Sequence, residues 1–372
     1  PGPRKLRGTG CTRRAICGSP RSPRLGGALR TMADEFASYQ GPRLHEFYRA
    51  LFASSRSAEF DNWFHGYCGY LVDPFQARRF YSYTRYLAEL SGRPVTPATR
   101  ILDVGCGFGP ACLAFFLMGS REVHGLEIHE PMVRTFRVSL EILSLQPFIR
   151  VQRGNAGRLQ DHYPPDAFDL VLSNEALSHY EDVDGFLRGC YALLRPGGAL
   201  VISDTNNGLN PWTRWKTRRI WARFELGPPG PIYQHTVDVP FIELRRRIIR
   251  SEAPALSDPE VESLARETFG LRGREVREAI RLFVERGIHP RRPFRWGACP
   301  MNPEADQYME YLFYPLALAR RVAGFGFRAR AQAYLGGATR GGIVARFNRL
   351  WVRLTPLTIH CSQAFNLIAI KP

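Results

Sequence analysis

Three glycines within five positions follow an apolar run in ILDVGCGFGPACLAFF, residues 101–116. Glycine permits positive φ and lets a ligand approach the main chain, but each one costs conformational entropy on folding. A glycine cluster between an apolar strand and the start of an apolar helix therefore indicates a ligand held against the backbone. A tight strand-to-helix turn without a ligand would have the same pattern, so the rest of the chain must decide.

A carboxylate stands at a second informative position. Glu127 follows Gly105 by 22 residues and ends another apolar run, residues 122–127. A carboxylate there can accept hydrogen bonds from ribose hydroxyls, and it would repel a 2′-phosphate. The glycine cluster and the acid at this spacing together indicate a ligand that contains adenosine.

The glycine pattern fits two common types of nucleotide-binding loop poorly. A nicotinamide fingerprint would place a third small residue at position 110, which is Pro110 here. A phosphate-binding loop of the Walker type would need Gly-Lys-Ser/Thr after the glycines, and none follows.

Apolar segments of strand length alternate with segments of helical periodicity from about residue 100. The expected strands are residues 100–105, 122–127, 148–153, 168–173 and 198–204. The expected helices begin near Pro110 and cover residues 130–145 and 183–198. Strands separated by helices predict a doubly wound, mostly parallel sheet of the Rossmann-like α/β class.

Composition divides the chain into five segments. We expect a disordered basic tail (1–31), an N-terminal helical cap (32–99), a cofactor-binding core (100–204), an inserted, mainly helical substrate lobe (205–306) and a C-terminal part of the core (307–372). In the last segment, residues 307–322 have the pattern of a helix, and strands are expected within residues 324–335 and 363–372.

The net charge of +17 could indicate nucleic-acid binding, but about half of it lies in the N-terminal tail. Residues 1–30 hold eight basic residues and no acid, so 17 minus 8 leaves +9 for the rest of the chain. This tail resembles a transit-type presequence, which is rich in arginine and poor in acids. We favour the alternative that Met32, the first methionine, is the natural start.

Other global features narrow the class of protein. No run of eighteen apolar residues occurs, so a membrane-spanning helix is not expected. The eight cysteines are scattered without a Cys-x-x-Cys spacing, which predicts free thiols in a reducing compartment such as the cytoplasm. We expect no bound metal.

Seven segments in order resemble the motifs of the class I S-adenosylmethionine-dependent methyltransferase superfamily. They are ILDVGCGFG, HGLEI, GNAGRL, FDLVLSNEALSHYED, LLRPGGALVISD, GFRARA and FNLIAIKP. The resemblance covers residues 100–205 and resumes near residue 320. It implies a sheet of seven strands whose last strand is antiparallel and inserted beside the sixth, and it implies S-adenosylmethionine as the cofactor.

The resemblance also implies a role for individual residues. Asp103, Gly105 and Gly107 would surround the methionine moiety, with Gly109 supporting the loop. Glu127 would bind the ribose and Ile128 would pack on the adenine. Asn155 stands where the family usually has an aspartate that contacts the adenine amino group, and it keeps a carbonyl acceptor. The other implied cofactor neighbours are Cys106, Ala156 and Asn174.

Methyl transfer mainly requires that the nucleophile is aligned with the activated methyl group, which can contribute roughly 7–11 kcal/mol. A hydroxyl nucleophile also benefits from a general base. His179 and Glu175 are four residues apart and would share one face if their segment is helical. We take His179 as the candidate base, with Glu175 beside it. A histidine that only caps a loop or packs there is the alternative.

The acceptor is expected to be a small or lipid-like molecule, methylated on oxygen, nitrogen or carbon. Aromatic residues of the cap and lobe either line its site or belong to the core: Trp63, Phe64, Tyr67, Trp212, Tyr233 and Tyr311. His235 and Glu243 are further polar candidates.

Two other functions stay open. A nucleic-acid methyltransferase is disfavoured because SNEA follows the fourth strand, where Asn-Pro-Pro-Tyr or Asp-Pro-Pro-Tyr would be expected. A cofactor-binding module without catalysis, associated with a membrane surface, is suggested by the basic and aromatic segment RFNRLWVRLTPL, residues 346–357, which also fits a solvated surface helix.

Overall fold

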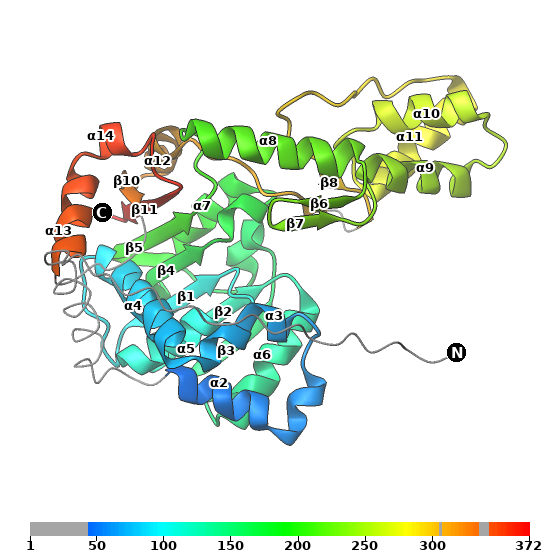
Figure 1. Cartoon of the computed structure of the whole chain (residues 1–372). Coiled ribbons are helices and arrows are strands. Elements are labelled where there is room, and N and C mark those ends of the chain that lie inside the picture. Colours follow the sequence, from blue (N-terminus) through cyan, green and yellow to red (C-terminus); the bar gives the residue numbers. More distant parts are fainter. Residues whose placement is uncertain (1–43, 305–306, 335–341) are drawn as a thin grey trace, which may run out of the picture. The chain divides into compact units, whose positions relative to one another are not determined.

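A sheet of seven strands forms the centre of the part of the chain that the computed structural model describes, residues 44–304, 307–334 and 342–372. The tail predicted for residues 1–31 lies outside these residues. The sheet order is β10-β11-β5-β4-β1-β2-β3 (Figure 1). The strands are β1 (Arg100–Val104), β2 (Glu122–Glu127), β3 (Ile149–Arg153), β4 (Phe168–Asn174), β5 (Leu194–Asp204), β10 (Arg328–Tyr334) and β11 (Ala364–Ile370).

The strand directions confirm the predicted fold class. β1 to β5 pair in parallel, whereas β11 runs antiparallel to both β5 and β10 and lies between them. Ile101, Val171 and Leu200 are fully buried, as parallel strands covered on both faces require. The carboxyl ends of the parallel strands therefore meet at one edge of the sheet, where ligands of such folds bind.

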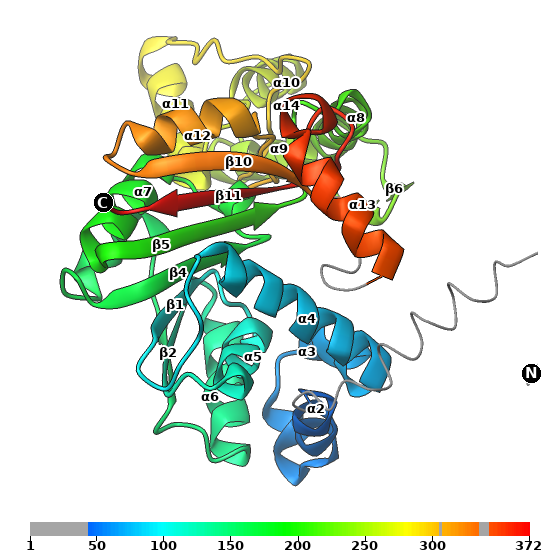
Figure 2. The ribbon, with the colours of Figure 1, turned by 90° about the vertical axis from the view of Figure 1, so that its left-hand side faces the viewer.

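Helices cover both faces of this sheet (Figure 2). α7 (Val183–Leu193) and α12 (Pro315–Ala323) share one apolar cluster with the strands. α5 (Pro110–Met118), α6 (Glu130–Ile142) and the N-terminal α4 (Pro74–Leu90) lie on the other face. Proline stands at the start of α5 and α6, where its missing N–H costs no hydrogen bond.

The described part of the N-terminal segment is helical and packs on the core. Its elements are α2 (Leu44–Ala53), α3 (Phe64–Cys68), α4 and the 3₁₀ helices η1 (Ser55–Glu59) and η2 (Gly69–Val72). Phe64 is fully buried and its ring meets that of Phe108 edge to face at 5.3 Å. Phe64 is therefore a core residue and does not line an acceptor site.

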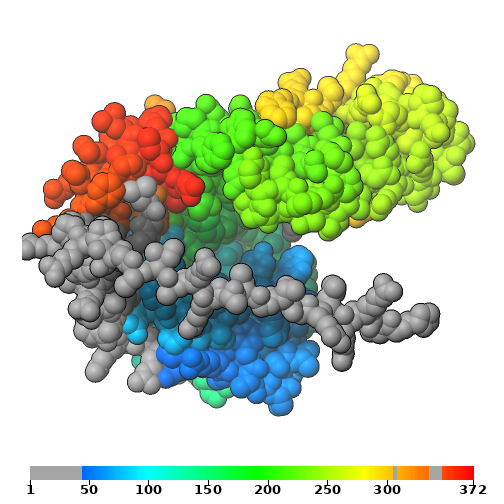
Figure 3. Space-filling model, in the orientation of Figure 1, coloured from blue at the N-terminus to red at the C-terminus, as the bar shows by residue number. Residues whose placement is uncertain are grey.

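The lobe between β5 and β10 has its own apolar core. Its elements are α8 (Pro211–Leu226), β6 (Gly230–Ile232), β7 (His235–Val237), α9 (Phe241–Glu252), α10 (Asp258–Glu267), α11 (Gly273–Arg286) and β8 (Met301–Asn302). Ile249, Leu264 and Val276 from α9, α10 and α11 form the centre of its cluster. In Figure 3 a recess separates the surface of the lobe, green to yellow, from that of the blue N-terminal helices.

Two predicted helix boundaries are wrong. Residues 307–322 do not form one helix: they contain the short strand β9 (Gln307–Tyr308), an extended segment and only then α12. Pro315 explains this, because proline in a helix interior would lack a hydrogen bond and clash with the preceding turn. The helix predicted for residues 183–198 ends at Leu193, and β5 begins at Leu194.

Between β10 and β11 the chain forms two further helices. They are α13 (Gly342–Arg353) and α14 (Thr355–Thr358), and both pack beside β10. The segment RFNRLWVRLTPL is therefore a surface helix and its continuation.

Candidate functional site

The glycine loop leaves β1 at the carboxyl edge of the sheet. Gly105, Gly107 and Gly109 all have positive φ, at 74°, 54° and 80°. The backbone N–H groups of Gly105 and Cys106 donate to the carbonyl oxygen of Leu126, at 2.8 and 3.2 Å. The loop is thereby held against the end of β2.

The three glycines are required for different reasons. A Cβ atom at Gly109 would lie 1.9 Å from Phe136 Cζ, and one at Gly105 would lie 2.5 Å from Ala176 Cβ. At Gly107, by contrast, no atom of the described residues lies within 4 Å of the Cβ position. Gly105 and Gly109 therefore permit close packing, whereas Gly107 faces open space that a ligand can occupy.

Glu127 closes this space from the end of β2. Its carboxylate accepts hydrogen bonds from the backbone N–H of Gly107 at 3.0 Å and of His129 at 2.9 Å. Its neighbour Ile128 is an exposed apolar side chain. A carboxylate beside a bare glycine, followed by an exposed aliphatic group, fits the ribose and the adenine of an adenosine ligand.

Asp103 lies beneath the loop and is almost fully buried. Burial is the main cause that raises the pKa of its carboxyl to about 7; the nearby charge of Glu127 adds to the rise, and a hydrogen bond from Cys112 Sγ at 3.6 Å opposes it. A cationic ligand group would favour the ionised carboxylate here. The Cys106 side chain is also buried, so only its backbone is placed to contact a ligand.

The remaining predicted cofactor residues lie past the ends of β3 and β4. Asn155 is exposed and its Oδ1 accepts from the Gly157 N–H at 2.8 Å, while Ala156 packs against the core cluster. Asn174 Oδ1 accepts from the hydroxyl of Tyr83 at 3.1 Å. Tyr83 comes from α4, and sequence reasoning missed it because nothing in a helical periodicity marks a residue that reaches a strand end.

The predicted pairing of His179 with Glu175 is wrong. Glu175 has a positive φ of 52° in the turn after β4, and the helical segment η4 (Leu177–His179) has only three residues. Glu175 Oε2 instead accepts from the backbone N–H and the hydroxyl of Thr205, at 3.2 and 2.7 Å. A turn this tight leaves no helical face for the two side chains to share.

His179 faces a different carboxylate, that of Glu310. His179 Nε2 lies 3.9 Å from Glu310 Oε1, and Glu310 Oε2 accepts from Asn206 Nδ2 at 3.1 Å. The segment that carries Glu310 is fixed by backbone hydrogen bonds from Tyr311 to Ser178 and from Phe313 to Asn206, both 2.9 Å. Sequence reasoning missed Glu310 because it placed this segment inside a helix.

Three carboxylates come close together at this point. Desolvation by the surrounding protein and the charge of Asp204 together raise the pKa of the Glu175 carboxyl to about 7, although the side chain is still exposed to solvent. Asp204 is fully buried, which raises the pKa of its carboxyl, while hydrogen bonds from the N–H groups of Asn206 and Ser178 oppose the rise. The region can hold protons near neutral pH.

The glycine loop and the turn that carries His179 are in direct contact. Ala176 and Tyr180, on either side of η4, lie 2.5 and 3.2 Å from the Cβ position of Gly105. The Tyr180 hydroxyl donates to the carbonyl oxygen of Val104 at 2.7 Å. The turn that carries His179 is therefore packed on the glycine loop.

A cavity of about 270 Å³ opens beside Glu310. Its lining includes the predicted residues Trp212 and His235, together with Lys216 and Trp221 of α8 and Asn206. Three other acceptor candidates lie elsewhere. Tyr311 lines a separate cavity of about 450 Å³, Glu243 forms an ion pair with Arg246 at 2.9 Å, and Trp63 stacks on His129.

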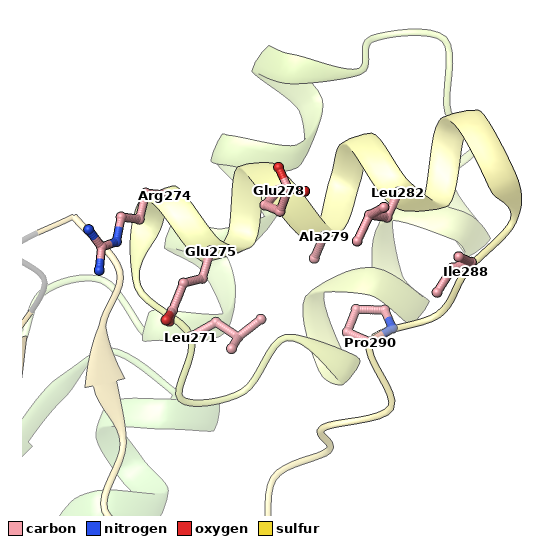
Figure 4. Close-up of a pocket in the computed structure, with 8 residues that line it drawn as sticks. All are labelled: Leu271, Arg274, Glu275, Glu278, Ala279, Leu282, Ile288 and Pro290. Atoms are coloured by element: carbon pink, nitrogen blue, oxygen red, sulfur yellow. The ribbon is translucent and has the colours of Figure 1, made fainter.

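A larger cavity of about 520 Å³ belongs to the lobe alone (Figure 4). It lies against α11 and the segment that follows it, and none of the predicted site residues lines it. Its lining residues are Leu271, Arg274, Glu275, Glu278, Ala279, Leu282, Ile288 and Pro290.

Two features are absent from the described residues. Within them, no group of three His, Cys, Asp or Glu side chains is arranged to hold a metal ion. No helix in the same part of the chain combines the length and the hydropathy needed to cross a bilayer. The six cysteines in the described ranges are free thiols.

Known proteins resemble this chain over its core. Residues 102–202 match the family described as a methyltransferase domain. A ubiquinone biosynthesis O-methyltransferase of Bradyrhizobium sp. (strain ORS 278) is 30% identical over 156 residues, which cover 42% of this chain and 52% of that protein. One of Xanthomonas campestris pv. campestris (strain B100) is 32% identical over 120 residues, covering 32% of this chain and 48% of that protein.

The chain thus spans about half the length of the curated relatives it matches. Among solved structures, an S-adenosylmethionine-dependent methyltransferase from Mesorhizobium loti is similar with a TM-score of 0.40 and 19% identity. That similarity covers 77% of this chain and 96% of the other.

Proposed function

We propose that this chain, which belongs to the class I S-adenosylmethionine-dependent methyltransferase superfamily, transfers a methyl group to a hydroxyl oxygen of a small or lipid-like acceptor. The observation that carries the proposal is the position of His179. It faces Glu310 on a turn that is packed directly on the glycine loop. A potential base therefore stands on a turn that packs against the same glycine loop.

The residues around that space fit the cofactor of the superfamily. Glu127 would hold the ribose hydroxyls, Ile128 would cover the adenine, and Asp103 would attract the ammonium group of the methionine moiety. S-adenosylmethionine supplies a methyl group already activated on a sulfonium, so the protein has to align the acceptor and exclude water. Asn155 and Asn174 would border the adenine and the methionine side.

The proposed acceptor site is the cavity beside Glu310. Trp212 and Trp221 offer aromatic walls, while Lys216 and His235 offer polar groups. Such a lining suits an acceptor with a planar or isoprenoid body and one polar end. The names of the curated relatives, which refer to O-methylation in ubiquinone biosynthesis, support a hydroxyl acceptor.

His179 would take the proton from that hydroxyl as the oxygen attacks the methyl group. Glu310, fixed by Asn206, would orient the imidazole and stabilise its charged form. Glu175 and Asp204 lie nearby, and in their ionised forms they would further favour an imidazolium product. We also propose that the protein acts in the cytoplasm, because the cysteines of the described residues are free thiols scattered along the chain.

Transfer of a radiolabelled methyl group from S-adenosylmethionine to an isoprenyl-substituted catechol tests the proposal. We expect a methyl ether product by mass spectrometry. His179→Ala should lower kcat by about 100-fold or more, and Glu310→Gln by about tenfold, with little change in cofactor affinity. His289→Ala and Glu285→Gln, exposed on the lobe, are the matched controls.

A lower kcat in Glu310→Gln with unchanged KM and cofactor affinity would support the orienting role. Unchanged kcat in His179→Ala would refute the base. Methylation only of amine acceptors, with the hydroxyl probe untouched, would refute O-methyl transfer while leaving the cofactor site intact.

A further inference from the structure

The outer face of α13 and α14 carries a stripe of large apolar side chains. Phe347, Leu350, Leu354 and Leu357 have exposed fractions of 52%, 53%, 46% and 74%. Their spacing of three, four and three residues places them on one helical face. The backbone N–H of Leu354 donates to Leu350 at 3.1 Å, and that of Thr358 to Leu354 at 3.0 Å, so the helical path continues through the junction of α13 and α14.

The inner face is fixed, so the stripe cannot turn inward. Trp351 packs against the core cluster of the sheet, and its Nε1 donates to Ser362 Oγ at 2.8 Å. Thr358 Oγ1 donates to the carbonyl oxygen of Trp351 at 2.8 Å, and Thr355 Oγ1 accepts from the backbone N–H of Ala333 at 3.1 Å. Rotating the helix would break all of these contacts.

Basic residues flank the apolar stripe. Arg346, Arg349 and Arg353 are exposed on α13. The sequence after Glu310 contains nine Lys and Arg residues and no Asp or Glu. Arginine can extend its aliphatic stem along an apolar surface and keep its guanidinium at a polar boundary. The face is therefore amphipathic, with a positive rim.

Exposed tryptophans lie at the neighbouring end of α8. The backbone oxygen of Ser362 accepts from Asn207 Nδ2 at 2.8 Å and from Asn210 Nδ2 at 3.2 Å, and Asn210 caps α8. In the first turns of α8, Trp212 and Trp215 are exposed and stack at 4.8 Å. Tryptophan is the side chain most suited to the boundary between lipid and water.

We infer that α13, α14 and the start of α8 form a surface that docks on an anionic lipid bilayer. A second copy of this chain would present the same positive rim, and residues 1–30 carry eight basic residues and no acid, so neither complements the charge. Anionic headgroups match the arginines, and the acyl boundary accepts the apolar stripe. A nucleic acid would match the arginines but would leave the leucines in water.

The docking surface also lies beside the proposed acceptor site. Trp212 and Gln363 line the cavity next to Glu310, and Gln363 follows Ser362 at the edge of the surface. A lipid-like acceptor held in the bilayer would therefore reach the cavity directly. This consequence rests on the proposed function, whereas the docking itself does not.

Sedimentation of the full chain with vesicles tests the docking, without cofactor or acceptor. The probes are vesicles of phosphatidylcholine with and without phosphatidylglycerol. We expect binding to the anionic vesicles only. The double variant Phe347→Ser/Leu350→Ser should weaken it by about tenfold, and Arg349→Glu/Arg353→Glu by at least as much. Cofactor affinity, measured in solution, should be unchanged in both.

Control variants on the lobe carry matched changes. Val284→Ser/Ile288→Ser removes two equally exposed apolar side chains, and Arg274→Glu/Arg286→Glu reverses two exposed arginines. Equal losses in test and control variants would overturn the inference, because the overall positive charge would then explain binding. It would also be overturned if RNA competed fully and only the arginine variant lost binding.

Discussion

The two halves of the candidate site are built in different ways. On the cofactor side, backbone geometry dominates: a glycine loop at the end of β1 is hydrogen-bonded to the end of β2 and backed by an apolar cluster. On the proposed acceptor side, individual side chains such as Glu310 and Trp212 come from the lobe and from the segment that leads from the lobe to α12. Most of these residues lie outside the central sheet. The first arrangement can recur in many proteins, whereas the second can change with each acceptor.

The interiors of the central sheet and of the lobe also differ. The sheet is stabilised by apolar side chains, but the lobe buries a charged pair. Arg245 and Glu225 are both almost completely buried and bonded to each other, and Arg245 Nε also donates to the Ala265 carbonyl oxygen at 2.9 Å. This pair ties α8 to α9 and α10.

Removing one partner of that pair should give the largest effect on stability. Glu225→Ala leaves the guanidinium of Arg245 buried without a countercharge, which costs about 3–5 kcal/mol. We expect the lobe to unfold at lower urea concentration, with acceptor turnover lost and cofactor affinity kept. Tryptophan fluorescence would mainly follow the lobe, which holds four of the six tryptophans. Glu285→Ala, exposed on α11, is the control, and loss of cofactor binding in Glu225→Ala would contradict the independence of the two halves.

A second prediction compares two carboxyl groups whose pKa values are both raised to about 7. Such a group binds its proton more tightly in the folded state, so its contribution to stability is present below about pH 4 and is lost as the pH rises to 7. Asp103→Asn should therefore be more stable than the parent above pH 7, by on the order of 2 kcal/mol.

Glu175→Gln should gain much less, because Glu175 keeps solvent contact and water screens its charge. Urea unfolding between pH 4 and 8 measures both differences. Equal gains in the free energy of unfolding for the two variants would show that the difference in burial between Asp103 and Glu175 has no effect on stability.

A third prediction distinguishes a glycine that faces a ligand from one that faces solvent. Gly107 and Gly92 both have positive φ, 54° and 77°, and no described atom lies within 4 Å of either Cβ position. Alanine at each should cost about 1 kcal/mol of stability. Only Gly107→Ala should also weaken S-adenosylmethionine binding, by about tenfold, as measured by calorimetry. Similar cofactor affinities in the two variants would place the ligand elsewhere.

The sequence predicted the strands and the glycine loop of the proposed cofactor half well because their signals are local. Apolar runs of strand length marked the strands, and the position of Glu127 at the end of β2 followed from its distance to the glycines. The resemblance implied the antiparallel β11 between β5 and β10, which is confirmed. Local patterns could not separate the roles of Gly105, Gly107 and Gly109, because Phe136 and Ala176 come from other elements.

The acceptor half was harder to predict because its contacts join distant segments. Glu310 lies 131 residues beyond His179 in the chain, and no spacing links them. Apolar periodicity suggested a helix across Glu310, although Pro315 requires the helix to begin there. Nothing in the sequence marks Arg245 and Glu225 as buried, because each stands among other charged residues in a basic segment.

Calorimetric titration of S-adenosylmethionine into the full chain tests directly whether Glu127 and the glycine loop hold this cofactor. The parent is compared with Glu127→Ala at the carboxyl end of β2 and with Glu122→Ala at the opposite end of the same strand. Loss of two hydrogen bonds to a carboxylate should weaken binding about 100-fold or more in Glu127→Ala. Glu122→Ala should match the parent. If the folded parent does not bind, or if the two variants bind equally well, Glu127 and the glycine loop do not hold the cofactor.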